Sequence, residues 1–251
     1  MSLNFTALSE APIIELDSID STNNYAMQLI DADTAQPGLT ITALQQTHGK
    51  GQRGRTWNDT PGSSLLMSII TTHPLLLNHQ FQLIMATAVA VAVTLQDLYE
   101  QWDVRIKWPN DIIVNDKKAG GILIENVIRG NNWLYSIIGL GLNVKQESFP
   151  IELPHATSLK IASGIDFDLK TLRDKLRLEI LEQTAKCAVN QDLLKQYNGL
   201  LYRKGNVQGF ADAKESWEAI IIAAAQDGTL HVQLPNGSIV PYTHGMVTWT
   251  W

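Results

Sequence analysis

The sequence predicts an α+β protein, with a mixed sheet and helices on one side of it, followed by a small SH3-like β-barrel. Residues 16–144 contain β-branched segments of strand length between helical segments, and residues 168–189 have the pattern of a long amphipathic helix. Residues 205–251 instead contain short alternating segments separated by the tight turns QDG and PNG. We therefore divide the chain into a domain at residues 1–198 and a second domain at residues 199–251.

The first elements alternate between strand and helix. LDSIDSTNNYAMQLIDAD reads as a strand, a turn and a helix, which Asp20, Ser21 or Thr22 can cap. The segments at 38–46 and 63–72 are predicted strands, so the glycine-rich stretch between them joins two strands. The apolar face expected for the helix consists of Tyr25, Ala26, Leu29 and Ile30.

A second helix is expected over residues 80–101, and its apolar run is too short to cross a bilayer, which predicts a buried helix. The next stretch predicts a strand ending at Lys107, a Pro-Asn-Asp turn, and a hairpin whose turn is NDKK. WLYSIIGLGLNV (133–144) predicts a strand that runs into a loop with two glycines. The helix at 168–189 places four apolar residues on one face: Leu172, Leu176, Ile180 and Leu181.

Composition excludes some classes of function. The net charge of −6 gives no general attraction to nucleic acid or to a membrane, so we expect neither as a partner. Three cations nevertheless gather within six positions, at Lys50, Arg53 and Arg55, which favours a small anionic ligand. Cys187 is the single cysteine, so an intramolecular disulfide is excluded. The first basic residue is Lys50, which argues against a signal peptide and predicts a cytoplasmic protein.

The segment THGKGQRGRTW (47–57) matches the G-x-G-x-x-G dinucleotide fingerprint, but its context does not fit. Turn-forming residues and a strand follow it, whereas a Rossmann fingerprint opens a helix and has an acidic residue about 20 positions later. Protein-kinase and P-loop motifs are absent from the sequence. Two interpretations stay open on the loop alone: a solvated surface turn, or a loop whose backbone N–H groups and cations bind an anion.

A set of motifs resembles those of the biotin protein ligases. STNNY, QQTHGKGQRGRTW, IKWPNDIIVNDKKAGGILIE, IIGLGLNV and ATSLK occur in the order and spacing of that family, over roughly residues 13–165. The resemblance implies a class II synthetase-like catalytic domain that uses ATP, biotin and Mg²⁺. It further implies that biotinyl-5′-AMP forms first, and that biotin then passes to a lysine in the biotin carboxyl-carrier domain of acetyl-CoA carboxylase or a related carboxylase.

The resemblance also implies roles for individual residues. Lys118 is the expected catalytic cation, because a lysine between a carboxylate and an α-phosphate offsets their repulsion. Asp111 is expected to orient Lys118 or to hold Mg²⁺. The expected biotin-binding residues are Ser21, Thr22, Asn23 and Gln46 for the ureido head and ring, with Lys50, Gly51, Gln52, Lys118 and Gly121. The expected ATP- or adenylate-binding residues are Gly49, Lys50, Arg53, Arg55, Trp57, Asn110 and Asn143, with Trp57 and Trp108 as apolar walls.

The glycine loop departs from the family pattern, which usually reads G-R-G-R-x-G-R. Lys50 lacks the bidentate fork of an arginine, and Gln52 is neutral where a cation is expected, so we expect weaker retention of biotinyl-AMP. Some members carry an N-terminal winged helix that binds DNA. The catalytic pattern here begins near residue 13, so we expect a stand-alone ligase.

Two alternatives remain at this stage. A lipoyl or octanoyl transferase has a related fold and also uses a hairpin lysine, although the octanoyl type needs a catalytic cysteine and Cys187 falls in the late helix. A non-catalytic protein that binds nucleic acid or peptide through the SH3-like domain is the other alternative. A homodimer, the acceptor carboxylase and the role of the C-terminal domain stay open.

Overall fold

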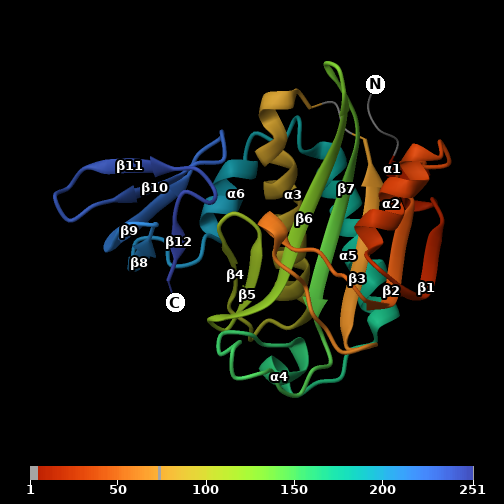
Figure 1. The fold of residues 1–251 in the computed structure, drawn as a ribbon, viewed down its shortest axis with the longest axis horizontal. Helices are drawn as coiled ribbons and strands as arrows, with labels where there is room; N and C mark the ends of the chain where they lie inside the picture. The colour runs from red at the N-terminus through yellow and green to blue at the C-terminus, as the bar shows by residue number, and fades with distance from the viewer. Residues whose placement is uncertain (1–4, 73–74, 251) are drawn as a thin grey trace.

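A computed structural model describes residues 5–72 and 75–250. Seven strands form the first sheet (Figure 1). In spatial order they are β1 (Ile13–Ile19), β2 (Thr40–Gln46), β3 (Ser64–Thr71), β7 (Asn132–Asn143), β6 (Lys117–Arg129), β5 (Asp111–Val114) and β4 (Val104–Lys107). β1 and β2 run parallel, and every other neighbouring pair is antiparallel. The predicted mixed sheet is therefore confirmed.

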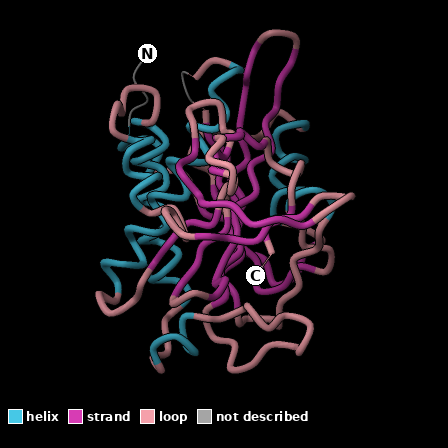
Figure 2. Tube along the Cα trace, turned by 90° about the vertical axis from the view of Figure 1, so that its left-hand side faces the viewer, coloured by secondary structure: helices cyan, strands magenta, loops and turns pink. Residues whose placement is uncertain are grey.

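The two long helices, α3 (Gln80–Leu98) and α5 (Leu169–Lys186), cover one face of this sheet. α2 (Thr22–Asp31) packs on the opposite face, as the alternation of neighbouring strand residues shows. Ile69 belongs to the cluster under α3 and α5, whereas Ile70 packs against Ala26 and Ile30 of α2. Figure 2 shows the strands with helices to either side. The site described below lies on the α2 face.

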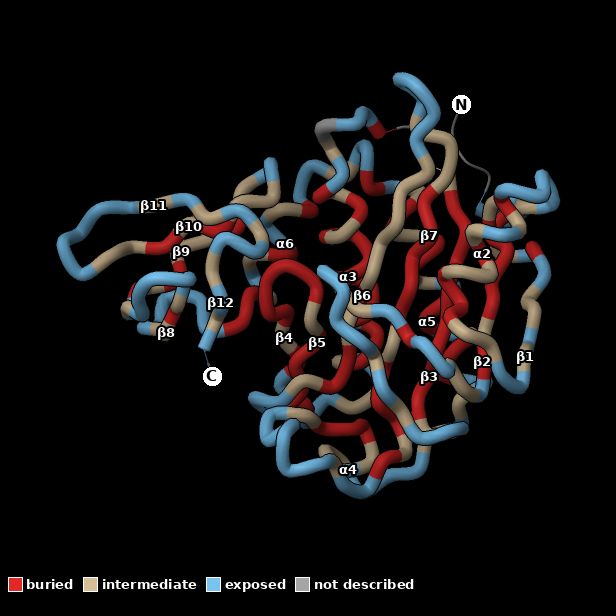
Figure 3. Tube along the Cα trace, in the orientation of Figure 1, coloured by how far each residue is buried: buried red, intermediate tan, exposed pale blue. Residues whose placement is uncertain are grey.

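α3 is a core helix, as the sequence predicts. It is long and apolar enough to cross a membrane by length and composition alone, yet 67% of that stretch is buried inside the protein. It packs against α5 and α6 (Leu193–Gly199), and the burial is visible in Figure 3. Sequence reasoning did not predict α6, nor the short helices α1 (Phe5–Ser9) and α4 (Leu159–Ser163).

The C-terminal residues form a separate five-stranded antiparallel sheet, on the left of Figure 1. Its order is β11 (Ile239–Tyr242), β10 (Leu230–Gln233), β9 (Ser216–Ala224), β8 (Val207–Ala211) and β12 (Thr248–Trp249). This sheet agrees with the predicted SH3-like β-barrel. β8 was missed, because QGF within it offers little of the β-branched pattern that marked the other strands.

One expectation about β7 was wrong. The two glycines of GLGL, Gly139 and Gly141, lie inside the strand and not in a loop after it. Gly139 pairs with Leu123 and Gly141 with Gly121 on β6. Glycine weakens a strand, so its use here indicates close approach of other groups to the sheet.

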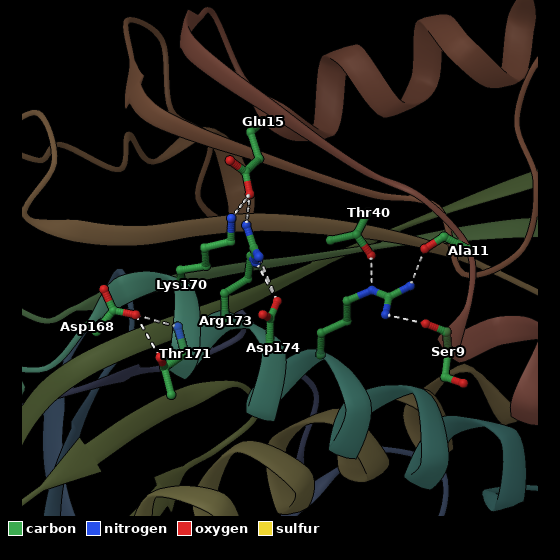
Figure 4. A network of polar contacts seen from close by, with 10 residues as sticks. Ser9, Ala11, Glu15, Thr40, Asp168, Lys170, Thr171, Arg173 and Asp174 are labelled. Atoms are coloured by element: carbon green, nitrogen blue, oxygen red, sulfur yellow. Dashed lines mark hydrogen bonds and ion pairs between the residues drawn. The ribbon is translucent and has the colours of Figure 1, made fainter.

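A buried arginine joins the N-terminal segment to α5 (Figure 4). Arg177 donates through Nε to the Thr40 hydroxyl at 2.8 Å and through its Nη atoms to four backbone carbonyls. These carbonyls belong to Leu8, Ser9, Ala11 and Gly38, at 2.8 to 3.2 Å. Burial lowers the pKa of Arg177. The guanidinium therefore holds the segment before β1 against the start of β2 through hydrogen bonds to neutral acceptors.

Candidate active site

A cavity of about 460 Å³ lies between the α2 face of the first sheet, the glycine loop and the C-terminal sheet. This volume is within the ordinary range for small-molecule sites. Most of the sequence-predicted residues line it: Ser21, Thr22, Asn23, Gln46, Lys50, Gly51, Gln52, Arg53, Arg55, Trp57, Trp108, Asn110, Asp111, Lys118 and Gly121. The fold therefore brings together residues that are up to 100 positions apart in the chain.

Two predicted residues do not line this cavity. Gly49 lines a neighbouring cavity on the other side of the glycine loop, and a Cβ there would overlap the Trp57 carbonyl oxygen. Asn143 is buried at the end of β7, where its Nδ2 donates to the Thr157 carbonyl at 3.0 Å and its Oδ1 accepts from Gln146. Its adenylate-binding role stays a prediction, and in this structure its side chain holds a loop.

The start of α2 supplies the polar end of the cavity. Ser21 is the N-cap residue, yet its side chain makes no capping hydrogen bond. The Thr22 backbone N–H and hydroxyl lie 2.8 and 3.1 Å from Gln46 Oε1, and the Thr22 hydroxyl also meets Ser68 at 2.7 Å. Asp20 instead accepts from Asn24 outside the cavity, which lowers the Asp20 pKa. Helix capping therefore does not occupy the side chains of Ser21 and Thr22.

Three glycines on β6 and β7 leave room for this polar end and for an aromatic wall. Gly121 and Gly141 are paired neighbours, and the Trp57 ring lies directly over them. A Cβ at Gly141 would overlap the Trp57 ring, and a Cβ at Gly139 would overlap Asn23 Oδ1. Gly139 and Gly141 are therefore required by close packing on the sheet, whereas a Cβ at Gly121 would make only ordinary contacts with Trp57 and Asp111.

Lys118 and Asp111 form an ion pair in the cavity. Lys118 Nζ lies 2.7 Å from Asp111 Oδ1, and the two side chains are 34% and 21% exposed. The hairpin turn before Lys118 has positive φ at both Asn115 and Asp116, which agrees with a type I′ turn. The Lys118 backbone is held from the other side, since its N–H donates to the His155 carbonyl at 2.7 Å.

Sequence reasoning missed Lys107, which lines the same cavity. Its side chain ends 5.4 Å from the centre of the Trp249 ring, and the residue is 8% exposed. Burial lowers the pKa of Lys107 to about 8, Asp111 opposes this change, and the Lys118 and Arg55 charges add to it. The signal was present in the sequence, because Lys107 ends an otherwise apolar strand one position before the Trp-Pro-Asn-Asp turn.

Ser68 and Glu125 were also missed. Ser68 lies on β3 and contacts Asn23, and Glu125 lies on β6 and contacts both Asn23 and Lys50. Each is a polar residue within an apolar strand, LLMSIIT and GILIENV, and a polar residue in that position needs a partner when it is buried.

The C-terminal sheet completes the cavity through Phe210 and the segment at 244–249. Arg53, which has φ of 55°, donates from Nη2 to the His244 carbonyl. A Cβ at Gly245 would overlap the Arg53 guanidinium. Burial lowers the His244 pKa, and the Arg53 charge adds to that effect. The glycine loop is thus closed against the C-terminal sheet by Arg53, while the Gln52 Oε1 atom is buried without a hydrogen-bond partner.

A Mg²⁺ site made by the protein alone does not fit these residues. Over residues 5–72 and 75–250, no three His, Cys, Asp or Glu side chains gather closely enough to hold a metal. Asp111 is the single carboxylate among the described residues that line the main cavity. One carboxylate does fit a Mg²⁺ ion that arrives with ATP and takes its remaining ligands from phosphates and water.

This fold, with its polar pocket, cationic loop and lysine–carboxylate pair, occurs in a chain that matches a known ligase family. The family model described as the Biotin/lipoate A/B protein ligase family matches residues 15–143, and the chain belongs to that family.

Individual relatives agree with this assignment. The chain is 34% identical over 211 residues to the bifunctional ligase/repressor BirA of Bacillus spizizenii, covering 82% of this chain and 58% of the relative. It is 39% identical over 112 residues to a human biotin–protein ligase, covering 43% of this chain and 15% of the relative. The biotin protein ligase from Aquifex aeolicus in complex with biotin and ATP has the same fold, with a TM-score of 0.78, 23% identity, and coverage of 95% and 98%. The chain spans about 58% of the length of the BirA relative.

Proposed function

We propose that this protein is a biotin protein ligase that forms biotinyl-5′-AMP from biotin and ATP and then transfers biotin to a protein lysine. The observation that carries the proposal is the placement of the Lys118–Asp111 ion pair in one cavity with the polar end of α2 and the cationic glycine loop. The human relative named biotin–protein ligase and the solved Aquifex aeolicus biotin protein ligase in complex with biotin and ATP support it.

In the first step a biotin carboxylate oxygen attacks the α-phosphorus of ATP, and pyrophosphate leaves with the electrons of the broken P–O bond. Lys118 stands between the two anions and stabilises the charge that develops on the phosphoryl oxygens. Lys50, Arg53, Arg55 and Lys107 add positive charge around the phosphates. Asp111 holds Lys118 in place and is the carboxylate that would contact Mg²⁺ brought in by ATP.

In the second step the neutral amine of an acceptor lysine attacks the acyl carbon, and AMP leaves. The attacking nitrogen gives up a proton, for which Asp111 is the available carboxylate in the main cavity among the described residues. We assign the acceptor to the biotin carboxyl-carrier domain of acetyl-CoA carboxylase or a related carboxylase. We further propose a cytoplasmic location, with neither nucleic acid nor a membrane as a partner.

The proposal assigns residues 1–198 to catalysis and residues 199–251 to a C-terminal domain. Two separate sheets support this division, and α6 ends at Gly199. The connecting residues also extend the first sheet, because the Ile106 N–H donates to the Leu200 carbonyl at 2.8 Å and the Tyr202 N–H donates to the Ile106 carbonyl at 2.9 Å.

Biotin is favoured over lipoate or octanoate by the hydrogen-bonding groups at the polar end. Thr22, Asn23 and Gln46 suit a ureido head, whereas an octanoyl chain has no group for them. A cysteine-dependent octanoyl transfer is not supported. Cys187 is 1% exposed, does not line the cavity, and has its pKa raised to about 11 by burial.

The test is exchange of labelled pyrophosphate into ATP with biotin, lipoate or octanoate as the acid. We expect exchange with biotin, and a loss of at least about a hundredfold in Lys118→Ala. Lys117→Ala is the matched control, because this exposed neighbouring lysine does not line the cavity. Exchange with octanoate in preference to biotin would support the transferase alternative, and no exchange with any acid would support a binding protein.

A further inference from the structure

The Glu125 carboxylate lies between two parts of the site that are far apart in sequence. Its Oε2 accepts from Asn23 Nδ2 at 2.8 Å, and its Oε1 lies 3.4 Å from Lys50 Nζ. Glu125 does not line the main cavity, although both of its partners do. Glu125 lies on β6 and lines the neighbouring cavity together with Gly49 and Lys50.

We propose that Glu125 is a positioning residue that fixes the hydrogen-bond pattern of the biotin head pocket and links that pocket to the glycine loop. This inference rests on the proposed biotin-ligase function. It assigns Glu125 no contact with substrate. Its effect passes through Asn23 on one side and through Lys50 on the other.

The direction of the hydrogen bonds follows from a count of hydrogens. An ionised carboxylate only accepts, so Asn23 turns its amide nitrogen toward Glu125 and its carbonyl toward Ser68. Ser68 Oγ lies 2.6 Å from Asn23 Oδ1 and 2.7 Å from Thr22 Oγ1. Ser68 has one hydroxyl hydrogen, and since the Asn23 carbonyl can only accept, that hydrogen goes to Asn23. The single Thr22 hydroxyl hydrogen then goes either to Ser68 or to the Gln46 Oε1 atom, which lies 3.1 Å away.

The chain of donors thus runs from Ser68 through Asn23 to the carboxylate of Glu125. The Thr22 hydrogen is used within the protein, which leaves the Thr22 oxygen as an acceptor. A ureido head carries one carbonyl between two N–H groups, so it binds well only where donors and acceptors have fixed places. A carboxylate at position 125 fixes them, whereas a neutral amide there could donate or accept and would let the Asn23 amide turn over.

The contact with Lys50 adds the link to the loop. The Lys50 and Glu125 side chains are 41% and 31% exposed, so this ion pair is weak and readily exchanged. Lys50 stands where the resembled family usually has an arginine, and a single ammonium makes one contact with the carboxylate instead of a fork. Glu125 therefore holds Lys50, and with it the glycine loop, by a weak exposed contact for which an anionic substrate would compete.

Glu125→Gln tests the inference, because it keeps the side-chain volume and removes the charge. We expect KM for biotin in pyrophosphate exchange, and the calorimetric Kd for biotin, to rise about tenfold while kcat changes less than about twofold. The preference for biotin over octanoate, expressed as a ratio of kcat/KM, should fall by a similar factor. Glu147→Gln is the control, because Glu147 pairs with Lys160 and does not line the cavity.

Ser68→Ala provides a second variant in the same chain of hydrogen bonds, and it should raise KM for biotin in the same way. Glu125→Gln added to Asn23→Ala should have almost no further effect on biotin affinity, because both act through one amide. An unchanged biotin KM in Glu125→Gln and Ser68→Ala, with exchange intact in the unmodified protein, would overturn this inference alone. An unmodified protein that neither binds nor activates biotin would overturn the proposed function as well.

Discussion

We expect Lys107 to make the proposed first half-reaction sensitive to alkaline pH. This lysine ends β4 inside the cavity, and burial lowers its pKa from 10.5 to about 8. Raising the pH from about 7 to about 9 therefore removes one positive charge from the place that receives the phosphates of ATP. Exchange activity should fall over this range because an uncharged amine no longer stabilises the phosphoryl oxygens.

The size of the effect follows from the pKa. At pH 9 about one tenth of the free protein keeps Lys107 charged, so kcat/KM for ATP should fall about tenfold from its value at pH 7. The stability of the folded protein should instead increase with pH. Because the folded pKa is the lower one, the unfolded chain binds more protons between about pH 8 and 10.5, and the contribution of Lys107 to the free energy of unfolding rises with pH there. Across the whole of this pH range, the contribution of Lys107 to the free energy of unfolding changes by about 3 kcal/mol.

The assay is biotin-dependent pyrophosphate exchange as a function of pH, without acceptor protein, so that ionisation of an acceptor lysine plays no part. Lys107→Arg is the matched variant, because a guanidinium stays charged throughout this range. Its activity should show no alkaline decline near pH 8. A decline with the same midpoint in Lys107→Arg would refute the assignment and place the titration on another group.

Other changes test the structure at separate points. Arg177→Met removes a donor from four backbone carbonyls, three of them in buried contacts, and should lower the free energy of unfolding by about 3–5 kcal/mol in chemical denaturation. A loss below about 1 kcal/mol would contradict the role of this network. Gln52→Arg restores the cation of the resembled loop and should slow release of biotinyl-AMP, measured by trapping the released adenylate; unchanged release would refute the expected weaker retention. Gly245→Ala should lower the free energy of unfolding by about 1–2 kcal/mol, because residue 245 has positive φ. The added methyl group should also displace Arg53 and make the glycine loop a faster target for trypsin. Equal cleavage rates in the two proteins would contradict the contact between Arg53 and Gly245.

Much of the architecture follows from local patterns in the sequence. β2, β3, α3, the β5–β6 hairpin and α5 were all predicted, because side-chain periodicity and turn residues act over a few positions. The short helices and β8 were missed because their segments are brief and weakly patterned, and tertiary packing stabilises them. The glycines of GLGL were misread as a loop because glycine marks turns more often than it marks a crowded strand.

The sequence by itself also determined the chemical groups of the site, since the motifs supplied Lys118, Asp111 and the polar end of α2. Only the tertiary structure decided which of these groups meet. Glu125 lies 102 positions from Asn23, and no local pattern reveals that contact. The low pKa of Lys107 likewise depends on the depth at which packing buries it. Burial and long-range contact are properties of the whole fold, whereas periodicity and motif spacing are properties of the chain.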